Sequence, residues 1–330
     1  MKVLVIGGGG YVGSLLVERL LECKYSVKVL DLFLFESPDI LFNDYNNSDS
    51  LKVIKGDVRD EDLLKNIIST VDIVIHLACI SNDPSFDLDP KLGKAINYDC
   101  FYPLIKICKQ NNIKKFIYAS SSSVYGVKDV SNVTENLSLE PLTDYSKYKA
   151  LCEDILLNES GDSVCSTILR PATVCGYSKR TRMDVIVNIL TNNAFNRRKL
   201  VIHGGSQKRP NIHIADMVRS YLSVLNSEEK LIRDQIFNVG FENHNLLEIG
   251  KLVKRMVGND VLIEFEETND LRSYHISSDK ISKQLNFTPK FSIKDAVMSL
   301  IDAFNSNLLK NSLEDPKYFN IKTMQLTNLI

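Results

Sequence analysis

Residues 2–13 read KVLVIGGGGYVG, an aliphatic run that passes directly into four glycines and then into an amphipathic stretch. Gly7, Gly10 and Gly13 give the spacing G-x-x-G-x-x-G. Glycine is required where a strand turns sharply into a helix, where backbone approaches a pyrophosphate and where the helix lies close to the sheet. A glycine pattern alone is a weak signal, but its place between a predicted strand and a predicted helix favours a dinucleotide-binding turn.

Two acidic residues fit the same interpretation. Asp31 ends the second predicted strand, 18 residues after Gly13. A carboxylate there accepts hydrogen bonds from ribose hydroxyls and repels a 2′-phosphate, which favours NAD over NADP. Asp57 follows the third predicted strand and is a candidate for the adenine amino group, with helix capping as the alternative.

Short β-branched runs alternate with amphipathic stretches over residues 1–170, which predicts a parallel sheet with helices on both faces. We expect strands at Lys2–Ile6, Val27–Leu30, Leu51–Ile54, Ile73–His76, Phe116–Ala119 and Ser166–Leu169. We expect helices at Val12–Cys23, Glu61–Ile68, Lys91–Asn111 and Tyr145–Asn158. The predicted fold class is α/β, a Rossmann-type doubly wound parallel sheet in which residues 1–170 form the NAD-binding domain.

The pattern loosens after Pro171, which predicts a smaller mixed α/β lobe over residues 171–307. Its expected helices lie near Asp184–Asn196, Ala215–Leu225 and Leu246–Met256. Its expected strands lie near Val201–His203, Ile236–Val239 and Val261–Phe265. Residues 308–330 form a polar tail to which the sequence assigns no role.

The composition excludes several classes of protein. Of the 330 residues, 44% are hydrophobic and 25% are charged, which is close to the globular average and argues against disorder. Forty basic and 41 acidic residues give a net charge of -1, so no basic excess attracts nucleic acid or a membrane surface. No apolar run approaches the ~20 residues that span a bilayer. The N-terminus has no room for a signal peptide, and we expect a cytoplasmic protein.

Seven cysteines are scattered without a C-x-x-C pair. Free thiols in a reducing compartment are therefore expected, rather than a disulfide framework or structural zinc.

A second group of residues indicates acid–base chemistry. Four serines, residues 120–123, follow the fifth predicted strand, at the sheet edge where doubly wound folds bind ligands. Tyr145 and Lys149 stand four apart on a predicted helix and share one face. A nearby ammonium and a positive nicotinamide ring would both lower the pKa of the tyrosine, which is about 10 in water. Tyr145 is therefore the candidate acid and base for a substrate hydroxyl or carbonyl.

Together these motifs resemble the extended short-chain dehydrogenase/reductase family, in particular its nucleotide-sugar epimerase/dehydratase branch, which includes UDP-glucose 4-epimerases. The resemblance extends to about residue 307. Besides the residues above, it includes HLAC at 76–79, where the family has H-x-A-A or H-x-A-G, and also Asn97, the Arg170-Pro171 pair and residues 209–213.

The resemblance implies a role for each matched residue. Ser121 would hydrogen-bond the reacting oxygen, Tyr145 would be the acid/base, and Lys149 would hold the nicotinamide ribose and tune Tyr145. The residues implied to bind NAD are Gly7, Gly10, Tyr11, Val12, Gly13, Asp31, Asp57, Val58, Leu77, Ala78, Asn97 and Lys149. The 4,6-dehydratases of the family carry an acidic pair after the catalytic serine or threonine, and Ser122 and Ser123 stand there instead. Dehydration is therefore disfavoured.

The second lobe of similar enzymes binds a nucleotide diphosphate, for which arginine supplies bidentate donors. Arg209 matches the arginine of the family motif R-D-Y-I-H, and Arg272 matches a second phosphate-binding arginine. Thr173 departs from the motif R-P-x-N-V-Y-G, in which an asparagine contacts the substrate. The residues expected at the substrate are Ser122, Ser123, Thr173, Arg180, Arg182, Asn188, Arg209 and Arg272. No metal site is expected.

The leading hypothesis is an NAD-dependent nucleotide-sugar epimerase that works through a transient 4-keto sugar. The alternative is an NAD-dependent nucleotide-sugar C4 dehydrogenase or 4-ketoreductase that releases its product. A third is a sensor that binds NAD without catalysis, which is disfavoured because Ser121, Tyr145 and Lys149 are all present.

The resemblance also implies a homodimer through a four-helix bundle made by Lys91–Asn111 and Tyr145–Asn158. The apolar residues Ile105, Cys108, Leu151 and Ile155 of these helices fit either a core or an interface.

Overall fold

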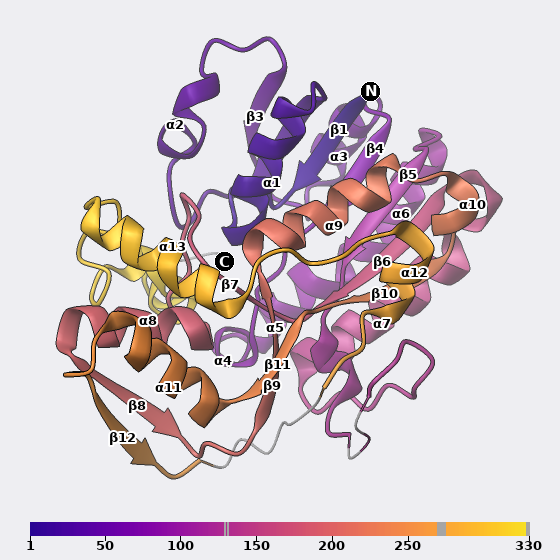
Figure 1. The fold of residues 1–330 in the computed structure, drawn as a ribbon. Helices are drawn as coiled ribbons and strands as arrows, with labels where there is room; N and C mark the ends of the chain where they lie inside the picture. Colours follow the sequence, from indigo (N-terminus) through magenta and orange to yellow (C-terminus); the bar gives the residue numbers. More distant parts are fainter. Residues whose placement is uncertain (129, 131, 269–274, 328–330) are drawn as a thin grey trace.

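A parallel seven-stranded sheet forms the centre of the computed structural model, which describes residues 1–128, 130, 132–268 and 275–327 (Figure 1). The strands are β1 (Lys2–Ile6), β2 (Ser26–Asp31), β3 (Leu51–Lys55), β4 (Ile73–His76), β5 (Lys115–Ala119), β6 (Cys165–Pro171) and β10 (Gln235–Val239). Their order is β10-β6-β5-β4-β1-β2-β3. The chain runs outward from β1 to β3 and then resumes on the other side of β1 at β4. This reversal opens a crevice at the carboxyl ends of β1 and β4, where such sheets bind ligands.

Helices cover both faces of this sheet. On one face lie α1 (Tyr11–Glu22), α9 (Ile214–Asn226) and α12 (Asp279–Leu285), and on the other lie α3 (Glu61–Ile68), α6 (Phe101–Gln110) and α7 (Asp144–Glu159). Side chains of β1 alternate between the two cores: Val3 and Val5 join the first, and Leu4 and Ile6 join the second. Each of these fully buried side chains contributes roughly 1.5–3 kcal/mol, which explains the uninterrupted aliphatic run in the sequence.

The six strands expected within residues 1–170 are confirmed, with ends that differ by no more than two residues. The strand expected at Ile236–Val239 is present as β10, but its placement in the second lobe was wrong. β10 pairs in parallel with β6 and completes the main sheet, with Phe237 opposite Leu169. A short apolar run shows that a strand is buried, and it does not show which sheet the strand joins.

The helix expected at Lys91–Asn111 is broken into three parts. They are α5 (Pro90–Lys94), a π-helical turn η2 (Ala95–Asp99) and α6. The wider turn directs the amide of Asn97 to the backbone N–H and C=O of Ile80, at 2.8 and 2.9 Å. Sequence periodicity does not reveal one π turn within a helical pattern.

The second lobe lies below the sheet in Figure 1 and has a separate core. Its strands are β7 (Thr173–Cys175), β8 (Lys199–His203), β9 (Lys208–His213), β11 (Glu242–Asn245) and β12 (Leu262–Glu266), which form the sheets β11-β9-β7 and β12-β8. Its main helices are α8 (Ile186–Arg197), α11 (Leu246–Val257) and α13 (Ile293–Asn305). The chain also forms the short helices α2 (Pro38–Leu41), α4 (Asp83–Phe86), α10 (Glu229–Ile232) and α14 (Asn320–Leu326).

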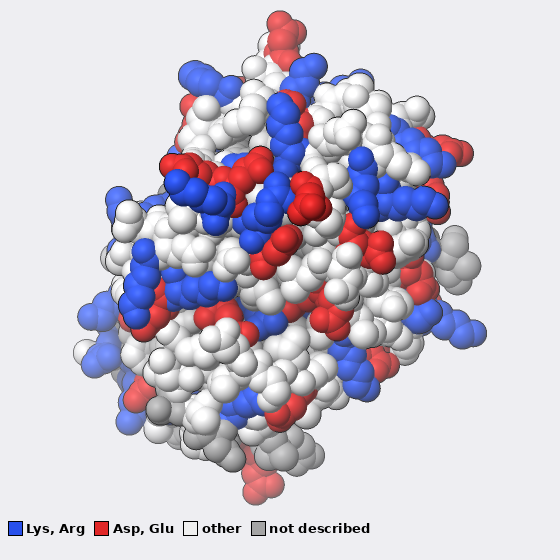
Figure 2. Space-filling view, turned by 90° about the vertical axis from the view of Figure 1, so that its right-hand side faces the viewer, with Lys and Arg blue, Asp and Glu red and all other residues white. Residues whose placement is uncertain are grey.

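Basic and acidic side chains are intermixed on the face shown in Figure 2, as the near-zero net charge suggests. Within the described residues, no helix has the length and apolar character needed to cross a bilayer.

Candidate active site

The crevice holds a cavity of about 490 Å³ between the carboxyl ends of the sheet and the second lobe. Most residues predicted to bind cofactor or substrate line it: Gly7, Gly10, Tyr11, Val12, Gly13, Asp31, Asp57, Val58, Leu77, Ala78, Ser121, Ser122, Ser123, Tyr145, Lys149, Thr173, Arg180, Arg182 and Arg209. Arg272 lies outside the described residues. Asn97 and Asn188 are buried and do not line the cavity.

The glycine loop is held in a conformation that larger residues would disrupt. Gly7 has φ of +87°, and a Cβ there would lie 2.5 Å from the backbone nitrogen of Ala78. A Cβ on Gly13 would collide with the carbonyl oxygen of Gly7. Gly10 is the N-cap of α1 and has no side chain to cap the first N–H groups of the helix. These N–H groups, at the positive end of the helix dipole, suit a pyrophosphate.

Asp31 stands at the opposite side of this loop. Its carboxylate accepts hydrogen bonds from the backbone N–H groups of Gly9 and Phe33, at 2.9 and 2.8 Å. Burial raises the pKa of Asp31, and the two backbone hydrogen bonds oppose the rise. Each carboxylate oxygen keeps a further lone pair, so the group can still accept from ribose hydroxyls.

Asp57 also lines the cavity, but it does not cap a helix, because Asp60 is the N-cap of α3. Asp57 instead pairs with Arg59, whose Nη2 lies 2.7 Å from its Oδ2. Helix capping, the alternative role for Asp57, is therefore wrong, because the aspartate that caps α3 is Asp60.

The three candidate catalytic residues Ser121, Tyr145 and Lys149 lie together in the cavity, at the end of β5 and on α7. The Oγ atoms of Ser121 and Ser123 lie 2.8 Å apart, and the side chain of Ser121 acts on the phenol of Tyr145 and lowers its pKa. The Nζ of Lys149 donates to the carbonyl oxygen of Ala119 at 2.7 Å and lies 5.9 Å from the centre of the Tyr145 ring. Because an ammonium has three donors, Lys149 has protons left for a ligand in the cavity.

The protein by itself raises the pKa of Tyr145 above its usual value. Burial is the main cause, and Cys79 and Asp83 act in the same direction, whereas Arg182 and the hydrogen bond to Ser121 lower the pKa. Our expectation that Lys149 would lower this pKa omitted desolvation, which disfavours the phenolate in a closed pocket.

Helix α7 is anchored to the sheet by a buried ion pair. Arg170 on β6 and Glu153 on α7 are joined by bonds from Nε at 3.0 Å and from Nη2 at 2.5 Å, and Ser120 donates to the same carboxylate. Glu153 lies one turn beyond Lys149 and two turns beyond Tyr145, so this pair fixes both candidate catalytic residues relative to β5 and β6.

Asn188 was expected to approach the substrate diphosphate, and the structure corrects this. The side chain is fully buried, its Oδ1 accepts from the N–H of Gly176 at 2.9 Å, and its Nδ2 donates to Arg182 at 2.7 Å. The same Nδ2 donates to the hydroxyl of Tyr11 at 3.0 Å. Asn188 therefore links the glycine loop to the loop before α8. Asn97 does not line the cavity, and its amide bonds to the backbone of Ile80, which does.

Several residues that line the cavity were not predicted from the sequence. Asp83 follows β4, influences the pKa of Tyr145 and accepts a hydrogen bond from Thr143 at 2.5 Å. The others that sequence reasoning missed are Phe35, Cys79, Ser81, Asn82, Asp184, Asn320 and Met324. For Asp83 a signal existed, since it lies in the loop after the carboxyl end of a central strand. Nothing in the sequence of the tail pointed to Asn320.

These residues fit a dinucleotide: uncapped helix N–H groups, a carboxylate for the ribose and a lysine near the catalytic tyrosine. A family model described as the NAD dependent epimerase/dehydratase family matches residues 3–240. A curated relative, the uncharacterized UDP-glucose epimerase YtcB of Bacillus subtilis, is 28% identical over 316 residues, covering 93% of this chain and 98% of the relative.

Solved structures agree with this assignment. UDP-glucuronic acid 4-epimerase from Bacillus cereus, in complex with UDP-glucuronic acid and NAD, is 26% identical with a TM-score of 0.84, covering 93% of this chain and 100% of that chain. The dTDP-glucose 4,6-dehydratase DesIV from Streptomyces venezuelae is 21% identical with a TM-score of 0.85, covering 95% and 100%, and shows the fold alone. With the matching family model and the fit of the cavity to a dinucleotide, the chain belongs to the NAD dependent epimerase/dehydratase family, whose cofactor is NAD.

Proposed function

We propose that the protein is an NAD-dependent epimerase of a nucleotide sugar that works through a transient 4-keto intermediate, with Tyr145 as the acid/base. The observation that carries this proposal is that Ser121, Tyr145 and Lys149 line the same cavity as the glycine loop. Bound NAD would supply the hydride acceptor for C4 of the sugar and the donor that restores it.

The residues of the chain would handle the proton. Tyr145 removes it from the 4-hydroxyl and returns it to the 4-keto oxygen, and Ser121 hydrogen-bonds that oxygen throughout. Because burial raises the pKa of Tyr145, the phenol is protonated at neutral pH until a positive charge enters the cavity beside it. This coupling would restrict proton removal to the loaded enzyme.

Elimination of water is not supported by the residues next to Ser121. Ser122 is buried, Ser123 is hydrogen-bonded to Ser121, and neither ionises. Asp83 is a carboxylate in the same cavity, but its Oδ1 accepts a hydrogen bond from the hydroxyl of Thr143, the N-cap of α7. Asp83 is therefore committed to the loop and helix that position Tyr145.

The experiment is incubation of the purified protein, with no added NAD, with UDP-, dTDP-, GDP- and CDP-hexoses, followed by mass spectrometry and NMR of the products. An epimer has an unchanged mass, and the vicinal coupling constants of its C4 proton differ from those of the substrate. A product lighter by one water would mean a dehydratase, and an oxidised sugar with free NADH would support the dehydrogenase alternative. Either result would overturn the proposal.

Variants of α7 test the mechanism. Tyr145→Phe is expected to reduce turnover by about 10²- to 10⁴-fold while NAD stays bound. Tyr148→Phe is the matched control, because Tyr148 stacks against Tyr98 and Phe86, with ring centres 5.2 and 5.7 Å apart, and stands outside the cavity lining. If turnover survived in Tyr145→Phe, the acid/base would have to be another residue, and the assigned mechanism would be wrong.

For the substrate we propose contacts from Ser122, Ser123, Thr173, Arg182 and Arg209, which line the cavity. A neutral replacement of Arg209 should raise KM for the nucleotide sugar about tenfold or more, with NAD content unchanged. A change in NAD content with unaltered KM would place Arg209 at the cofactor instead.

We also propose the homodimer through α6 and α7. Of the four apolar residues predicted there, Ile105 and Cys108 are buried within the chain's own core, whereas Leu151 is 42% exposed. Tyr102, on α6, is 49% exposed. Light scattering should give twice the chain mass, and Leu151→Asp should give the monomer mass. A wild-type monomer at micromolar concentration would contradict this proposal.

A further inference from the structure

Arg180, in the loop before α8, has an unusual environment. It is 4% exposed, its guanidinium carbon lies 3.8 Å from the centre of the Phe35 ring, and its Nη2 donates to Oδ1 of Asn320 at 2.5 Å. Its Nε is buried and has no hydrogen-bond partner among the described residues. Arg180 also lines the cavity. A buried arginine with an unused donor is costly unless an anion completes its surroundings.

The surroundings of Arg180 belong to the cofactor end of the cavity. Phe35 follows β2, and the charges of Asp31 and Tyr11 both act on the guanidinium. Arg182, two residues further, pairs with Asp184 at 2.5 Å and acts on the pKa of Tyr145, and the charges of Arg182 and Asp184 also act on Arg180. Arg180 differs from Arg182 in packing against the Phe35 ring and in having a buried Nε without a partner among the described residues.

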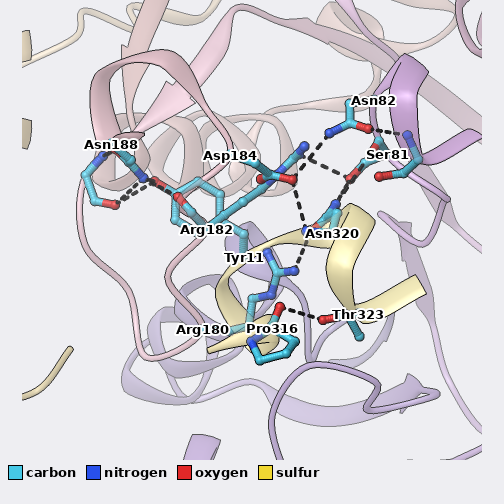
Figure 3. A network of polar contacts seen from close by, with 12 residues as sticks. Tyr11, Ser81, Asn82, Arg180, Arg182, Asp184, Asn188, Pro316, Asn320 and Thr323 are labelled. Carbon is cyan, nitrogen blue, oxygen red and sulfur yellow. Dashed lines mark hydrogen bonds and ion pairs between the residues drawn. The ribbon is translucent and has the colours of Figure 1, made fainter. Parts of the chain in front are cut away.

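Asn320 comes from the C-terminal tail, the segment to which the sequence assigned no role. Figure 3 shows it at the start of α14, between Arg180 and Ser81. Its Nδ2 donates to Oγ of Ser81 at 2.7 Å, and its backbone N–H donates to Asp184 at 3.0 Å. One side chain thus joins the loop after β4, the loop before α8 and the tail.

Further contacts fix the tail over the cavity. The N–H of Met183 donates to the carbonyl oxygen of Tyr318 at 2.8 Å, and Lys317 pairs with Glu36 at 2.8 Å in the loop that also carries Phe35. Met324, one turn beyond Asn320, lines the cavity. The tail is therefore attached to the loops on both sides of the cofactor end.

We propose that Arg180 binds the pyrophosphate of NAD from the side opposite the glycine loop, and that Asn320 positions this arginine so that the C-terminal tail retains the cofactor. Arg180 lines the same cavity as Asp31 and the glycine loop, and it packs against Phe35 in the loop after β2. Asn320 occupies Nη2 and leaves Nε as a donor for the anion. The proposal rests on the cofactor site and not on which reaction follows.

The test uses the full chain stripped of nucleotide, with ADP-ribose and AMP as probes in calorimetric titrations. Both probes carry adenosine, and only ADP-ribose carries the pyrophosphate. Arg180→Gln is expected to weaken ADP-ribose about 10- to 100-fold, as for a charge-assisted hydrogen bond, and to leave AMP nearly unchanged. Arg180→Lys, which keeps the charge, should recover part of the affinity.

The role of the tail is tested by the rate at which NAD leaves the holoenzyme. Asn320→Ala should speed release about tenfold, because Arg180 loses the group that orients it. Asn320→Asp keeps the acceptor and should release NAD at nearly the wild-type rate. Thr327→Val is the control, since this hydroxyl donates only to Thr323 within the tail, at 2.7 Å.

Several outcomes would overturn the proposal. Equal weakening of AMP and ADP-ribose by Arg180→Gln would indicate a general disturbance of the site. Intact ADP-ribose affinity with weakened nucleotide-sugar affinity would return Arg180 to the substrate. Unchanged NAD release from Asn320→Ala would remove the tail from cofactor retention. None of these measurements requires turnover, so their failure is separate from failure of the proposed epimerase.

Discussion

Removal of the carboxylate of Glu153 should destabilise the protein more than any surface substitution. Glu153 and Arg170 have side chains only 2% and 3% exposed, and the carboxylate accepts from both Arg170 and Ser120. Burial alone would lower the pKa of Arg170, but its bonds to Glu153 raise it, so Arg170 stays charged. Glu153→Leu therefore leaves a buried cation without its counterion.

The magnitude follows from these contacts. Loss of one partner of a buried ion pair costs about 3–5 kcal/mol. The entropy of unfolding is roughly 2.1 cal/mol/K per residue, or about 0.7 kcal/mol/K for this 330-residue chain. The substitution should thus lower Tm by about 4–7 °C. The double variant Glu153→Leu, Arg170→Met replaces the pair with apolar groups and should recover most of the loss.

Calorimetry of the four proteins in this cycle measures the coupling. Additive losses in the double variant, or a loss below about 1 kcal/mol for Glu153→Leu alone, would refute the ion pair as an anchor of α7. Because the same helix carries Tyr145 and Lys149, the folded Glu153→Leu enzyme should have a lower kcat and a smaller change in KM.

The remaining predictions concern the cofactor loop and pH. Gly7→Ala should abolish NAD retention, measured as nucleotide released on denaturation, because the residue combines φ of +87° with a backbone collision. Gly161→Ala is its control, since Gly161 has φ of +56° with nothing within 4 Å, and it should cost only about 1–2 kcal/mol. Burial, with a smaller contribution from Lys149, lowers the pKa of His76 to about 3. Stability is therefore full above the unfolded pKa of about 6.5 and is lost as pH falls toward 3, and urea titrations should show that His76→Phe flattens this decline. A hydrogen bond from the N–H of Lys2 and one from Lys114 lower the pKa of Asp72, so Asp72→Asn should be destabilising at pH 7. The difference should decline as pH falls below the unfolded pKa of about 4 and be lost once pH falls through the lower folded pKa. An undiminished difference at pH 2 would contradict that assignment.

Local sequence predicted much of the cofactor half, because each feature there has a local cause. The aliphatic run of β1 is buried on both faces, and the glycines at 7 and 13 are required by a turn within the same twelve residues. The separation of Tyr145 and Lys149 follows from helix geometry alone. These residues could be assigned without knowing their distant neighbours.

The substrate half was less predictable, because its polar residues acquire their roles from partners far along the chain. Asn188 has a side-chain amide of the kind that binds ligands, yet this amide is hydrogen-bonded to Tyr11, Gly176 and Arg182. The sequence of Gln235–Val239 indicates a strand but not which sheet it joins, and the structure shows that it pairs with β6.

By itself the sequence determined the Rossmann sheet, the preference for NAD and the candidate catalytic trio of Ser121, Tyr145 and Lys149, since short-range geometry and residue chemistry specify them. Only the tertiary structure showed that Arg180 and Asn320 of the C-terminal tail meet at the cavity. Arg180 and Asn320 lie 140 positions apart, and their contact depends on how the lobes and the tail come together in space. Contacts of that separation leave no periodic or spacing signal in the sequence.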